Sequence, residues 1–284
     1  MRVAVTGARG FVGRHVLAEL ARRQVGVVAS RRPGVDRGEP AAGGVEWVEL
    51  DIGDAGTDSF ALLDRPDVLI HLAWGGLPNY RSIHHFESEL PAQYGFLSRL
   101  VKSGLRALVA TGTCFEYGQQ SGPLAATTET RPTNPYGLAK DMLRKQLQQL
   151  QSIHPFDLTW ARLFYMHGDG QPETSLLPML RRAVAAGDTT FKMSAGEQLR
   201  DYLPVSEVAR RLVDLALSAR DRGPVNVCSG TPVSVRRLVE GWIADHGWKI
   251  ALELGQLPYP DYEPMAFWGV PPAEDAPGPC CVGT

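Results

Sequence analysis

The hydrophobic pattern in the first half of the chain alternates between short β-branched runs and longer amphipathic stretches. A strand-like run at 2–6 precedes a helical pattern at 11–23, and further strand-like runs follow at 25–30, 45–51, 68–73, 105–111 and 158–163. A long helical pattern at 136–153 places Leu143, Leu147 and Leu150 on one face. This alternation predicts an α/β fold, a doubly wound parallel sheet with helices on both faces, over residues 1–165.

After Gly168 the pattern becomes less regular, with helices expected at 176–186 and 206–219, a short strand near Thr190 and an extended segment at 199–204. We expect residues 166–269 to form a smaller C-terminal substrate-binding lobe over the carboxyl edge of the sheet, with part of the chain returning to the core. Residues 270–284 are rich in Pro, Gly and Ala and show no periodicity, which predicts a disordered tail.

Charge and composition exclude several classes of partner. The chain has 29 Lys and Arg against 31 Asp and Glu, so no global field would attract nucleic acid or an anionic membrane. No apolar run approaches the roughly 20 residues of a membrane span, and the chain starts directly with a strand-like run, so we expect a cytoplasmic protein. The four cysteines show neither a C-x-x-C pair nor a disulfide framework, and no metal site is predicted.

A glycine-rich motif, residues 6–13, lies between the first expected strand and the first expected helix. Glycines at this spacing permit a tight turn and let backbone amides and the helix N-terminus approach a pyrophosphate. This context is the one that a dinucleotide fingerprint of the Rossmann fold requires. The expected cofactor contacts are Gly7, Arg9, Gly10, Phe11, Val12 and Gly13.

The end of the second expected strand carries Ser30, Arg31 and Arg32, where an NAD enzyme normally places an acid for the ribose hydroxyls. A hydroxyl and guanidinium groups suit a 2′-phosphate, and Arg9 could add another cation. The pattern therefore predicts NADP(H), with NAD(H) as the alternative. The other interpretation of the two arginines is that they are solvated loop charges.

Further cofactor contacts are expected where other strands end. Asp51, with Ile52 beside it, could bind the adenine amine, although Asp51 could also cap a helix. The next strand should bring three residues to the pyrophosphate and ribose, namely Leu72, Ala73 and Trp74. His71, just before them, is expected to be a core histidine.

Tyr136 and Lys140 are four residues apart, so on a helix they share one face. A phenol with a pKa of about 10 is a poor acid or base at neutral pH, but a nearby ammonium group and an oxidised nicotinamide favour the phenolate. The preceding Asn134-Pro135 disfavours helix before Tyr136 and sets the helix start there. We expect Tyr136 and Lys140 to be catalytic and to contact the cofactor.

The segment Thr111-Gly112-Thr113-Cys114-Phe115-Glu116-Tyr117-Gly118 follows a buried strand at the edge where substrate and nicotinamide would meet. Together with the glycine motif and the Tyr136 and Lys140 couple, it resembles the extended short-chain dehydrogenase/reductase family, the sugar-nucleotide epimerase and dehydratase group. The resemblance covers residues 1–268. It implies that Thr113 is the third catalytic residue and polarises the substrate carbonyl.

The same resemblance implies roles for other residues. Arg200, in Arg200-Asp201-Tyr202, matches an element whose arginine binds the substrate diphosphate, a surface ion pair being the alternative. Tyr165 lies where many members have Asn in the sugar-nucleotide loop, and Glu89 also replaces a usual Asn. The expected substrate contacts are Thr113, Cys114, Phe115, Tyr165 and Arg200. A homodimer through the helices bearing 97–101 and 143–150 is also implied.

A dehydratase of this family would follow its catalytic Thr with an Asp-Glu pair, whereas this chain has Cys114-Phe115, which disfavours dehydration. The segment resembles reductases of nucleotide-linked 4-keto-6-deoxyhexoses. We therefore expect reduction of C4 with NADPH, with Tyr136 protonating the oxygen. The alternatives are a nucleotide-sugar 4-epimerase, a reductase of non-nucleotide ketones and an NADP-binding regulator without turnover.

Overall fold

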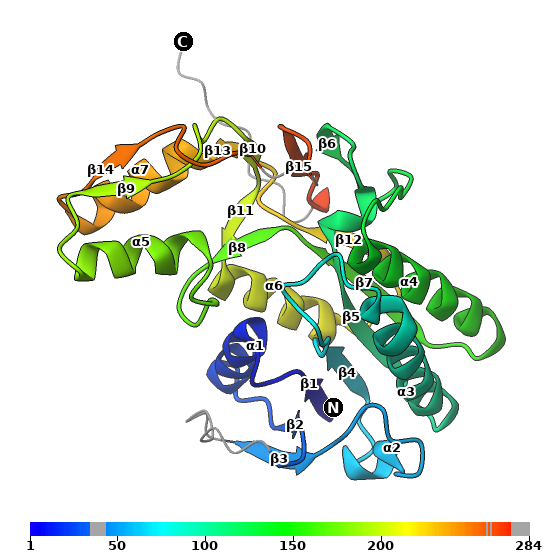
Figure 1. Cartoon of the computed structure of the whole chain (residues 1–284). Helices are drawn as coiled ribbons and strands as arrows, with labels where there is room; N and C mark the ends of the chain where they lie inside the picture. Colours follow the sequence, from blue (N-terminus) through cyan, green and yellow to red (C-terminus); the bar gives the residue numbers. More distant parts are fainter. Residues whose placement is uncertain (35–43, 260, 262, 274–284) are drawn as a thin grey trace.

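A seven-stranded parallel sheet forms the centre of the protein (Figure 1). The computed structural model describes residues 1–34, 44–259, 261 and 263–273. In spatial order the strands are β12 (Gly223–Val227), β7 (Asp157–Leu163), β5 (Ala107–Thr113), β4 (Val68–His71), β1 (Val3–Thr6), β2 (Val27–Arg31) and β3 (Val45–Glu49). The order reverses direction at β1, so the carboxyl ends of β1 and β4 flank the crevice where ligands of open α/β sheets bind.

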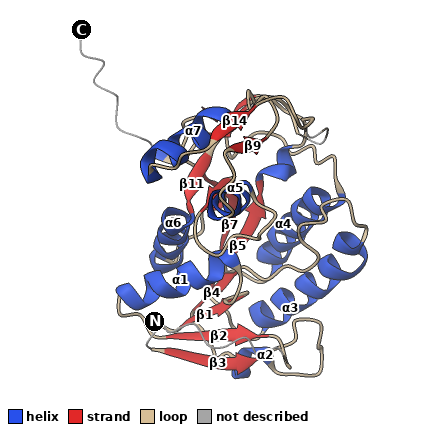
Figure 2. Ribbon diagram, turned by 60° about the vertical axis from the view of Figure 1, so that its left-hand side comes forward, coloured by secondary structure: helices blue, strands red, loops and turns tan. Residues whose placement is uncertain are grey.

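Helices cover both faces of the sheet, as Figure 2 shows. On one face α1 (Phe11–Arg22) and α6 (Val205–Ser218) pack together, and on the other face α3 (Leu90–Lys102) and α4 (Pro135–Ile153) do. The short helix α2 (Ser59–Leu62) contacts α3. Each face buries its own apolar cluster, so the sheet is sandwiched between two cores.

Local sequence explains where α4 begins. The side chain of Asn134 accepts a hydrogen bond from the amide of Gly137 at 2.8 Å, and Pro135 occupies the first helical position, where its missing N–H costs nothing. Leu143, Leu147 and Leu150 are buried against the sheet, which confirms the predicted apolar face. The cap therefore fixes the first turn of α4, which carries Tyr136.

The later part of the chain builds a second layer beyond the carboxyl edge, at the upper left of Figure 1. Its apolar cluster joins two helices and two paired strands, α5 (Leu176–Ala185), α7 (Val235–His246), β9 (Thr190–Lys192) and β14 (Ala251–Glu253). Three further pairs are β8 (Tyr165–His167) with β11 (Tyr202–Pro204), β10 (Leu199–Arg200) with β13 (Val233–Ser234), and β6 (Gly122–Leu124) with β15 (Phe267–Gly269). Two short helical segments complete the described elements, η1 (His85–Glu89) and η2 (Cys114–Tyr117).

The doubly wound parallel sheet that the sequence predicts is confirmed, with element ends differing by a few residues. The chain returns to the sheet through α6 and β12, so residues after 165 supply its seventh strand. Neither β12 nor α7 was expected from the pattern. The predicted tail falls mainly on 274–284, which lie outside the described residues, and no helix within the described ranges is long and apolar enough to cross a membrane.

Candidate active site

A cleft of about 930 Å³ opens at the carboxyl ends of β1, β2, β3 and β4. Eleven of the predicted cofactor contacts line it, namely Gly7, Arg9, Gly10, Ser30, Arg31, Arg32, Asp51, Ile52, Leu72, Ala73 and Trp74. Five others do not, namely Phe11, Val12, Gly13, Tyr136 and Lys140. The cleft thus collects residues that are distant in sequence but share one edge of the sheet.

The glycine motif provides a close-packed floor for this cleft. Gly7 has a φ of +69°, and a Cβ on it would lie 2.6 Å from the amide nitrogen of Ala73. A Cβ on Gly13 would lie 2.2 Å from the carbonyl oxygen of Gly7, so Gly13 packs α1 against the loop. The first amides of α1 have no acceptor within the helix and are available to an anion. This arrangement fits the pyrophosphate of a dinucleotide.

Three guanidinium groups and a hydroxyl surround the end of the cleft beside β2 and β3. Arg31 forms an ion pair with Glu49 at 3.6 Å, and the guanidinium of Arg9 lies 5.5 Å from the ring centre of Trp47. Arg32 is exposed and lines the cleft. The residues expected to bind a 2′-phosphate are therefore together, although Glu49 partly neutralises Arg31.

Asp51 lines the cleft and accepts a hydrogen bond from the amide of Gly53 at 2.9 Å. The N-cap of α2 is Asp58, whose side chain accepts from the amide of Ala61. The alternative that Asp51 caps a helix is therefore wrong. Its carboxylate stabilises a local turn and faces the cleft.

Several residues of the cleft wall were not predicted, and those on η1, on α3 and on the loop before η1 reach the cleft only through the fold. Glu89 was noted as a replacement for Asn. Its Oε2 accepts hydrogen bonds from the amide of Gly75 and from Nε2 of Gln93, each at 2.9 Å. Burial raises the pKa of Glu89, but these hydrogen bonds outweigh burial and the net pKa is lowered. The other missed wall residues are Pro33, Leu50, Gly53, Gly75, Gly76, His84, Ser88, Ala92 and Gln93.

His71 is buried below the cleft, as expected for a core histidine. Its Nδ1 lies 2.8 Å from Oγ1 of Thr6, and its Nε2 lies 2.8 Å from Oε1 of Gln93. Burial, aided by the charge of Lys140, lowers the pKa of His71 to about 3. The ring is therefore neutral at neutral pH and links β1 to α3.

The three predicted catalytic residues come together beside the cleft. Thr113 ends β5, while Tyr136 and Lys140 lie on the first turns of α4, and the Thr113 side chain is close enough to the phenol of Tyr136 to oppose the effect of burial on its pKa. Lys140 Nζ donates to the carbonyl of Thr111 at 2.9 Å and lies 6.0 Å from the ring centre of Tyr136. The fold therefore brings together residues of two separate motifs, the segment 111–118 and the Tyr136 and Lys140 couple.

The indole of Trp74 separates this constellation from the cleft. Lys140 Nζ lies 4.0 Å from its ring centre, and the ring of Tyr136 meets it edge-on at 6.0 Å. Trp74 Nε1 donates to Nδ1 of His85 at 3.1 Å, which holds the indole in place. Tyr136 and Lys140 thus touch a cleft-lining residue without themselves lining the cleft.

Burial controls the protonation of both side chains. It lowers the pKa of Lys140 to about 7, against the opposing charges of Glu116 and Glu89. It raises the pKa of Tyr136, an effect that the charges of Tyr80 and Glu116 strengthen and the hydrogen bond from Thr113 weakens. Burial therefore dominates the pKa of this phenol in the free protein, whereas the lowering expected from the sequence involved an oxidised nicotinamide as well as Lys140. Tyr136 is a phenol, able to donate a proton, at neutral pH.

Aromatic rings cover the other side of Tyr136. Phe115, a predicted substrate contact, lies 6.3 Å from it between ring centres, and Tyr80 lies 5.6 Å from it. The carbonyl of Tyr80 also accepts a hydrogen bond from the amide of Tyr136 at 3.2 Å. Cys114 is buried and burial raises the pKa of its thiol. Tyr80 was missed because it lies on an irregular loop.

The side chains of Arg200 and Tyr165 lie close together, and both bind the carboxylate of Glu263. Arg200 is only 3% exposed and its Nη2 lies 2.9 Å from Oε2 of Glu263. Arg200 Nη1 donates to the carbonyls of Leu199 and Met265, and the hydroxyl of Tyr165 donates to Oε1 of Glu263. The ion pair of Arg200 is thus buried, so the alternative of a surface pair is wrong. A bound anion would have to displace Glu263.

Within the ranges that the structure describes, no three His, Cys, Asp or Glu side chains are grouped to hold a metal ion. The chemistry of the described cleft instead suits a dinucleotide. Glycines form its floor, guanidinium groups lie at one end, and a phenol and an ammonium group lie behind the other wall.

Sequence comparison agrees with this geometry. Residues 3–228 match the profile of the NAD dependent epimerase/dehydratase family. The chain therefore belongs to this family and is an NAD(P)-dependent oxidoreductase of the extended short-chain dehydrogenase/reductase type.

Individual enzymes are also similar in sequence to this chain. The chain is 31% identical to a dTDP-6-deoxy-L-talose 4-dehydrogenase (NAD(+)) of Aggregatibacter actinomycetemcomitans, over 95% of this chain and 99% of that protein. It is 29% identical to a dTDP-6-deoxy-L-talose 4-dehydrogenase (NAD(P)(+)) of Kitasatospora kifunensis, over 92% and 83% of the two chains. A UDP-glucose 4-epimerase of Azospirillum brasilense is 28% identical, over 84% and 75%.

A solved structure is similar over almost the whole fold. MoeE5 in complex with UDP-glucuronic acid and NAD superposes with a TM-score of 0.78 at 26% identity, over 95% of this chain and 90% of that chain.

Proposed function

We propose that this enzyme reduces the 4-keto group of a nucleotide-linked 4-keto-6-deoxyhexose, with NADPH as the preferred cofactor. The observation that carries the proposal is the grouping of Thr113, at the end of β5, with Tyr136 and Lys140 on one face of α4. Tyr136 carries its proton at neutral pH, as reduction requires of the group that protonates the carbonyl oxygen.

Each residue has a distinct part in the proposed reaction. A bound nicotinamide supplies the hydride to C4. Thr113 donates a hydrogen bond that polarises the C4 carbonyl, and Tyr136 gives its hydroxyl proton to the developing alkoxide. Lys140 binds the ribose of the nicotinamide nucleotide and stabilises the phenolate that Tyr136 becomes. Gly7, Gly10 and the first turn of α1 hold the pyrophosphate.

The substrate class rests on the relatives and on the residues after Thr113. The name 6-deoxy-L-talose 4-dehydrogenase describes oxidation at C4 of a nucleotide-linked 6-deoxyhexose, and the proposed reduction is that hydride transfer in reverse. Cys114 and Phe115 provide no acid or base for elimination, which argues against dehydration. Phe115 and Tyr80 provide apolar rings beside Tyr136, where the deoxy face of such a sugar would pack.

The preference for NADPH rests on the end of β2. Ser30, Arg31 and Arg32 line the cleft at the position where a 2′-phosphate would lie, and β2 ends without an acid. The relatives are named with NAD(+) and with NAD(P)(+), so their names allow either cofactor. Arg32 is the best placed of the three residues, because the charge of Arg31 is shared with Glu49.

Binding of the substrate diphosphate by Arg200 belongs to the same proposal. The carboxylate of Glu263 occupies both the Nε and the Nη2 side of this guanidinium. A diphosphate presents oxygen acceptors of the same kind, so it would compete with Glu263 for this guanidinium. We further propose a homodimer through α3 and α4. Leu138 and Met142 of α4 are exposed apolar side chains that would become buried there.

A 4-epimerase is the second candidate, favoured by the similarity to UDP-glucose 4-epimerases. An epimerase recycles its cofactor, whereas a reductase consumes it in proportion to substrate.

The deciding experiment combines two measurements on the full chain. NADPH and NADH are titrated while nicotinamide fluorescence is followed, and a dTDP-linked 4-keto-6-deoxyhexose is then added while NADPH absorbance is recorded. We expect tighter binding of NADPH and one NADPH consumed per substrate. Preference for NAD⁺ with 4-epimerisation and no net consumption would make the enzyme an epimerase instead. The same keto-sugar without its nucleotide is the control, and equal turnover of it would contradict the nucleotide-sugar assignment.

A further inference from the structure

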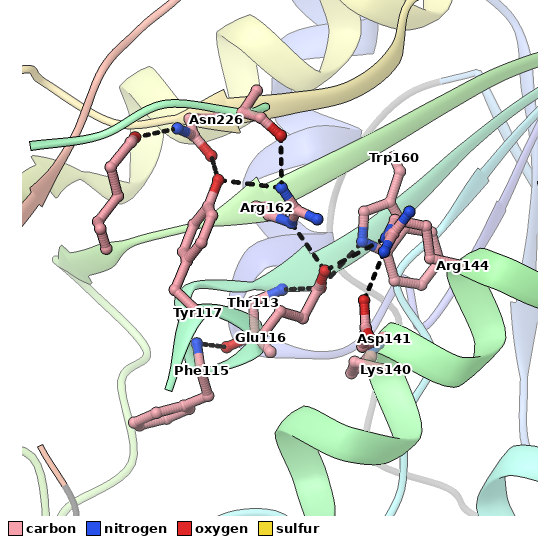
Figure 3. A network of polar contacts seen from close by, with 12 residues as sticks. Thr113, Phe115, Glu116, Tyr117, Lys140, Asp141, Arg144, Trp160, Arg162 and Asn226 are labelled. Atoms are coloured by element: carbon pink, nitrogen blue, oxygen red, sulfur yellow. Dashed lines mark hydrogen bonds and ion pairs between the residues drawn. The ribbon is translucent and has the colours of Figure 1, made fainter. Parts of the chain in front are cut away.

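A buried carboxylate lies directly behind the catalytic residues and takes no part in the proposed proton transfer. Glu116 has no solvent exposure, and both of its oxygens are engaged (Figure 3). Its Oε1 accepts hydrogen bonds from the backbone amide of Thr113 and from Nε1 of Trp160, each at 2.9 Å. Its Oε2 accepts from Nε of Arg162 at 2.7 Å. Three donors from two strands thus converge on one side chain.

The absence of a side chain at Gly112 leaves space for the carboxylate of Glu116. A Cβ on Gly112 would lie 2.4 Å from Oε1 of Glu116 and 2.2 Å from Nε1 of Trp160. Any other residue at this position of β5 would push the carboxylate or the indole away. The glycine between the two threonines of the Thr-Gly-Thr segment therefore has a specific structural purpose.

Hydrogen bonds hold both the backbone amide and the side-chain hydroxyl of Thr113. The Oγ1 of Thr113 accepts from the amide of Phe115 at 3.3 Å, while the carboxylate of Glu116 accepts from the amide of Thr113, which is a capping box. The two bonds fix both the backbone and the side-chain rotamer of Thr113. The same Thr113 hydroxyl contacts the hydroxyl of Tyr136.

The carboxylate is itself anchored by a wider network. Arg162 Nη1 donates to the hydroxyl of Tyr117 at 3.0 Å and to the carbonyl of Ala126 at 2.9 Å. The Tyr117 hydroxyl in turn donates to Oδ1 of Asn226 in β12 at 2.6 Å. Arg144 of α4 approaches Glu116 to 3.8 Å and binds Asp141 on its own helix. Glu116 is therefore held between β5, β7 and the helix that carries Tyr136.

We propose that Glu116 is a positioning residue of the enzyme, which holds the hydroxyl of Thr113 where it meets both Tyr136 and the substrate carbonyl. The expected effect on turnover rests on the proposed reduction, whereas the expected effect on the conformation of Thr113 does not. A carboxylate is needed because all three partners are donors. A glutamine has only one acceptor oxygen, and its amide would face a donor of Trp160 or Arg162.

The geometric part is tested with Glu116→Gln and with Trp160→Phe, which removes one donor but leaves the pair of Glu116 and Arg162 intact. Each protein is labelled at its threonine methyl carbons, and the three-bond couplings from the Thr113 methyl to backbone N and C′ report χ1. The Thr113→Ser variant, which lacks that methyl, assigns the resonance. We expect rotamer averaging of Thr113 in both variants. The matched control Glu129→Gln, at an exposed carboxylate, should leave the couplings unchanged.

The functional part is tested by a double-mutant cycle with Thr113→Ala. We expect Glu116→Gln to lower kcat by roughly 10- to 100-fold, the scale of a small misplacement of a catalytic group, with the KM and the NADPH affinity changed less than about twofold. In the Thr113→Ala background the same substitution should lower kcat by less than about twofold.

The proposal would be overturned if the kcat losses of Glu116→Gln and Thr113→Ala simply multiplied in the double variant. It would also be overturned if the Thr113 couplings stayed unchanged in both Glu116→Gln and Trp160→Phe. Absence of turnover by the unmodified enzyme would overturn the proposed reduction instead, and the couplings would still decide whether Glu116 positions Thr113.

Discussion

The protonation of Tyr136 connects burial to catalysis at the scale of a single residue. The phenol is 8% exposed, and burial raises its pKa, while Lys140 beside it has a pKa lowered to about 7. A buried acid of this kind keeps its proton until charge develops on the substrate oxygen next to it.

Replacement of Tyr136 by Phe should therefore abolish proton donation while keeping the ring contacts with Trp74 and Phe115. We expect kcat to fall by about 10²- to 10⁴-fold, the usual contribution of general acid catalysis. NADPH affinity, measured by fluorescence titration, should change less than about twofold. The control is Tyr94→Phe on α3, which should retain activity. A kcat for Tyr136→Phe within a few-fold of the unmodified enzyme would assign the proton donor to another group.

Sequence could identify the residues of the site that belong to short local motifs. Gly7, Thr113 and Tyr136 each lie at a fixed distance from neighbours that share the same chemistry. Tyr80 and Glu263 lie on irregular segments and reach the site only through tertiary packing. The burial of Tyr136, which raises the pKa of its phenol, also could not be predicted from the sequence.

At the scale of elements, the turn between β1 and α1 depends on the absence of a side chain. Gly7 adopts a left-handed φ of +69° and contacts the backbone at Ala73, so a Cβ there brings both strain and a steric clash. The site therefore depends on how closely the end of β4 approaches this turn.

We expect Gly7→Ala to lower the free energy of unfolding by roughly 1–3 kcal/mol and to weaken dinucleotide binding more than tenfold, because the floor of the cleft must shift. Urea denaturation and fluorescence titration measure the two effects. Gly26→Ala provides the control, since a Cβ on Gly26 meets no atom within 4 Å. Equal behaviour of the two variants would show that the turn tolerates a side chain.

The strands of the central sheet were predictable up to β7, as were α1 and α4, because each β-branched run is flanked by turn residues; α2, α3 and β6 were not predicted from the hydrophobic pattern. The strand β12 was not, since Gly223–Val227 is short and interrupted by Pro224 and Asn226. Its strand conformation comes from pairing with β7, where Asn226 also binds the hydroxyl of Tyr117. Tertiary context therefore decides the seventh strand.

At the scale of the whole molecule, His71 couples stability to pH. Its folded-state pKa of about 3 lies below the ordinary value of 6.5, so the folded protein binds fewer protons than the unfolded chain between these values. The stabilisation is fully present above about pH 6.5 and is lost as the pH falls towards 3.

Lowering the pH from about 7 to about 4.5 should cost about 3 kcal/mol of unfolding free energy through His71 alone, at 1.36 kcal/mol per unit. Urea denaturation of the unmodified protein and of His71→Asn at both pH values isolates this contribution, because the variant does not titrate there. His154→Asn, at an exposed position, should behave like the unmodified protein. An identical pH dependence for His71→Asn would mean that His71 is protonated in the folded state.

The position of β12, far after β7 in the sequence, also has a consequence for biosynthesis. During synthesis β7 emerges long before Gly223–Val227, and its outer edge, the side that β12 later covers, stays without a partner meanwhile. An unpaired apolar edge strand is a template for association with other chains. Premature termination or slow translation between β7 and β12 should therefore leave an aggregation-prone nascent chain, and chaperone demand should be concentrated in that interval.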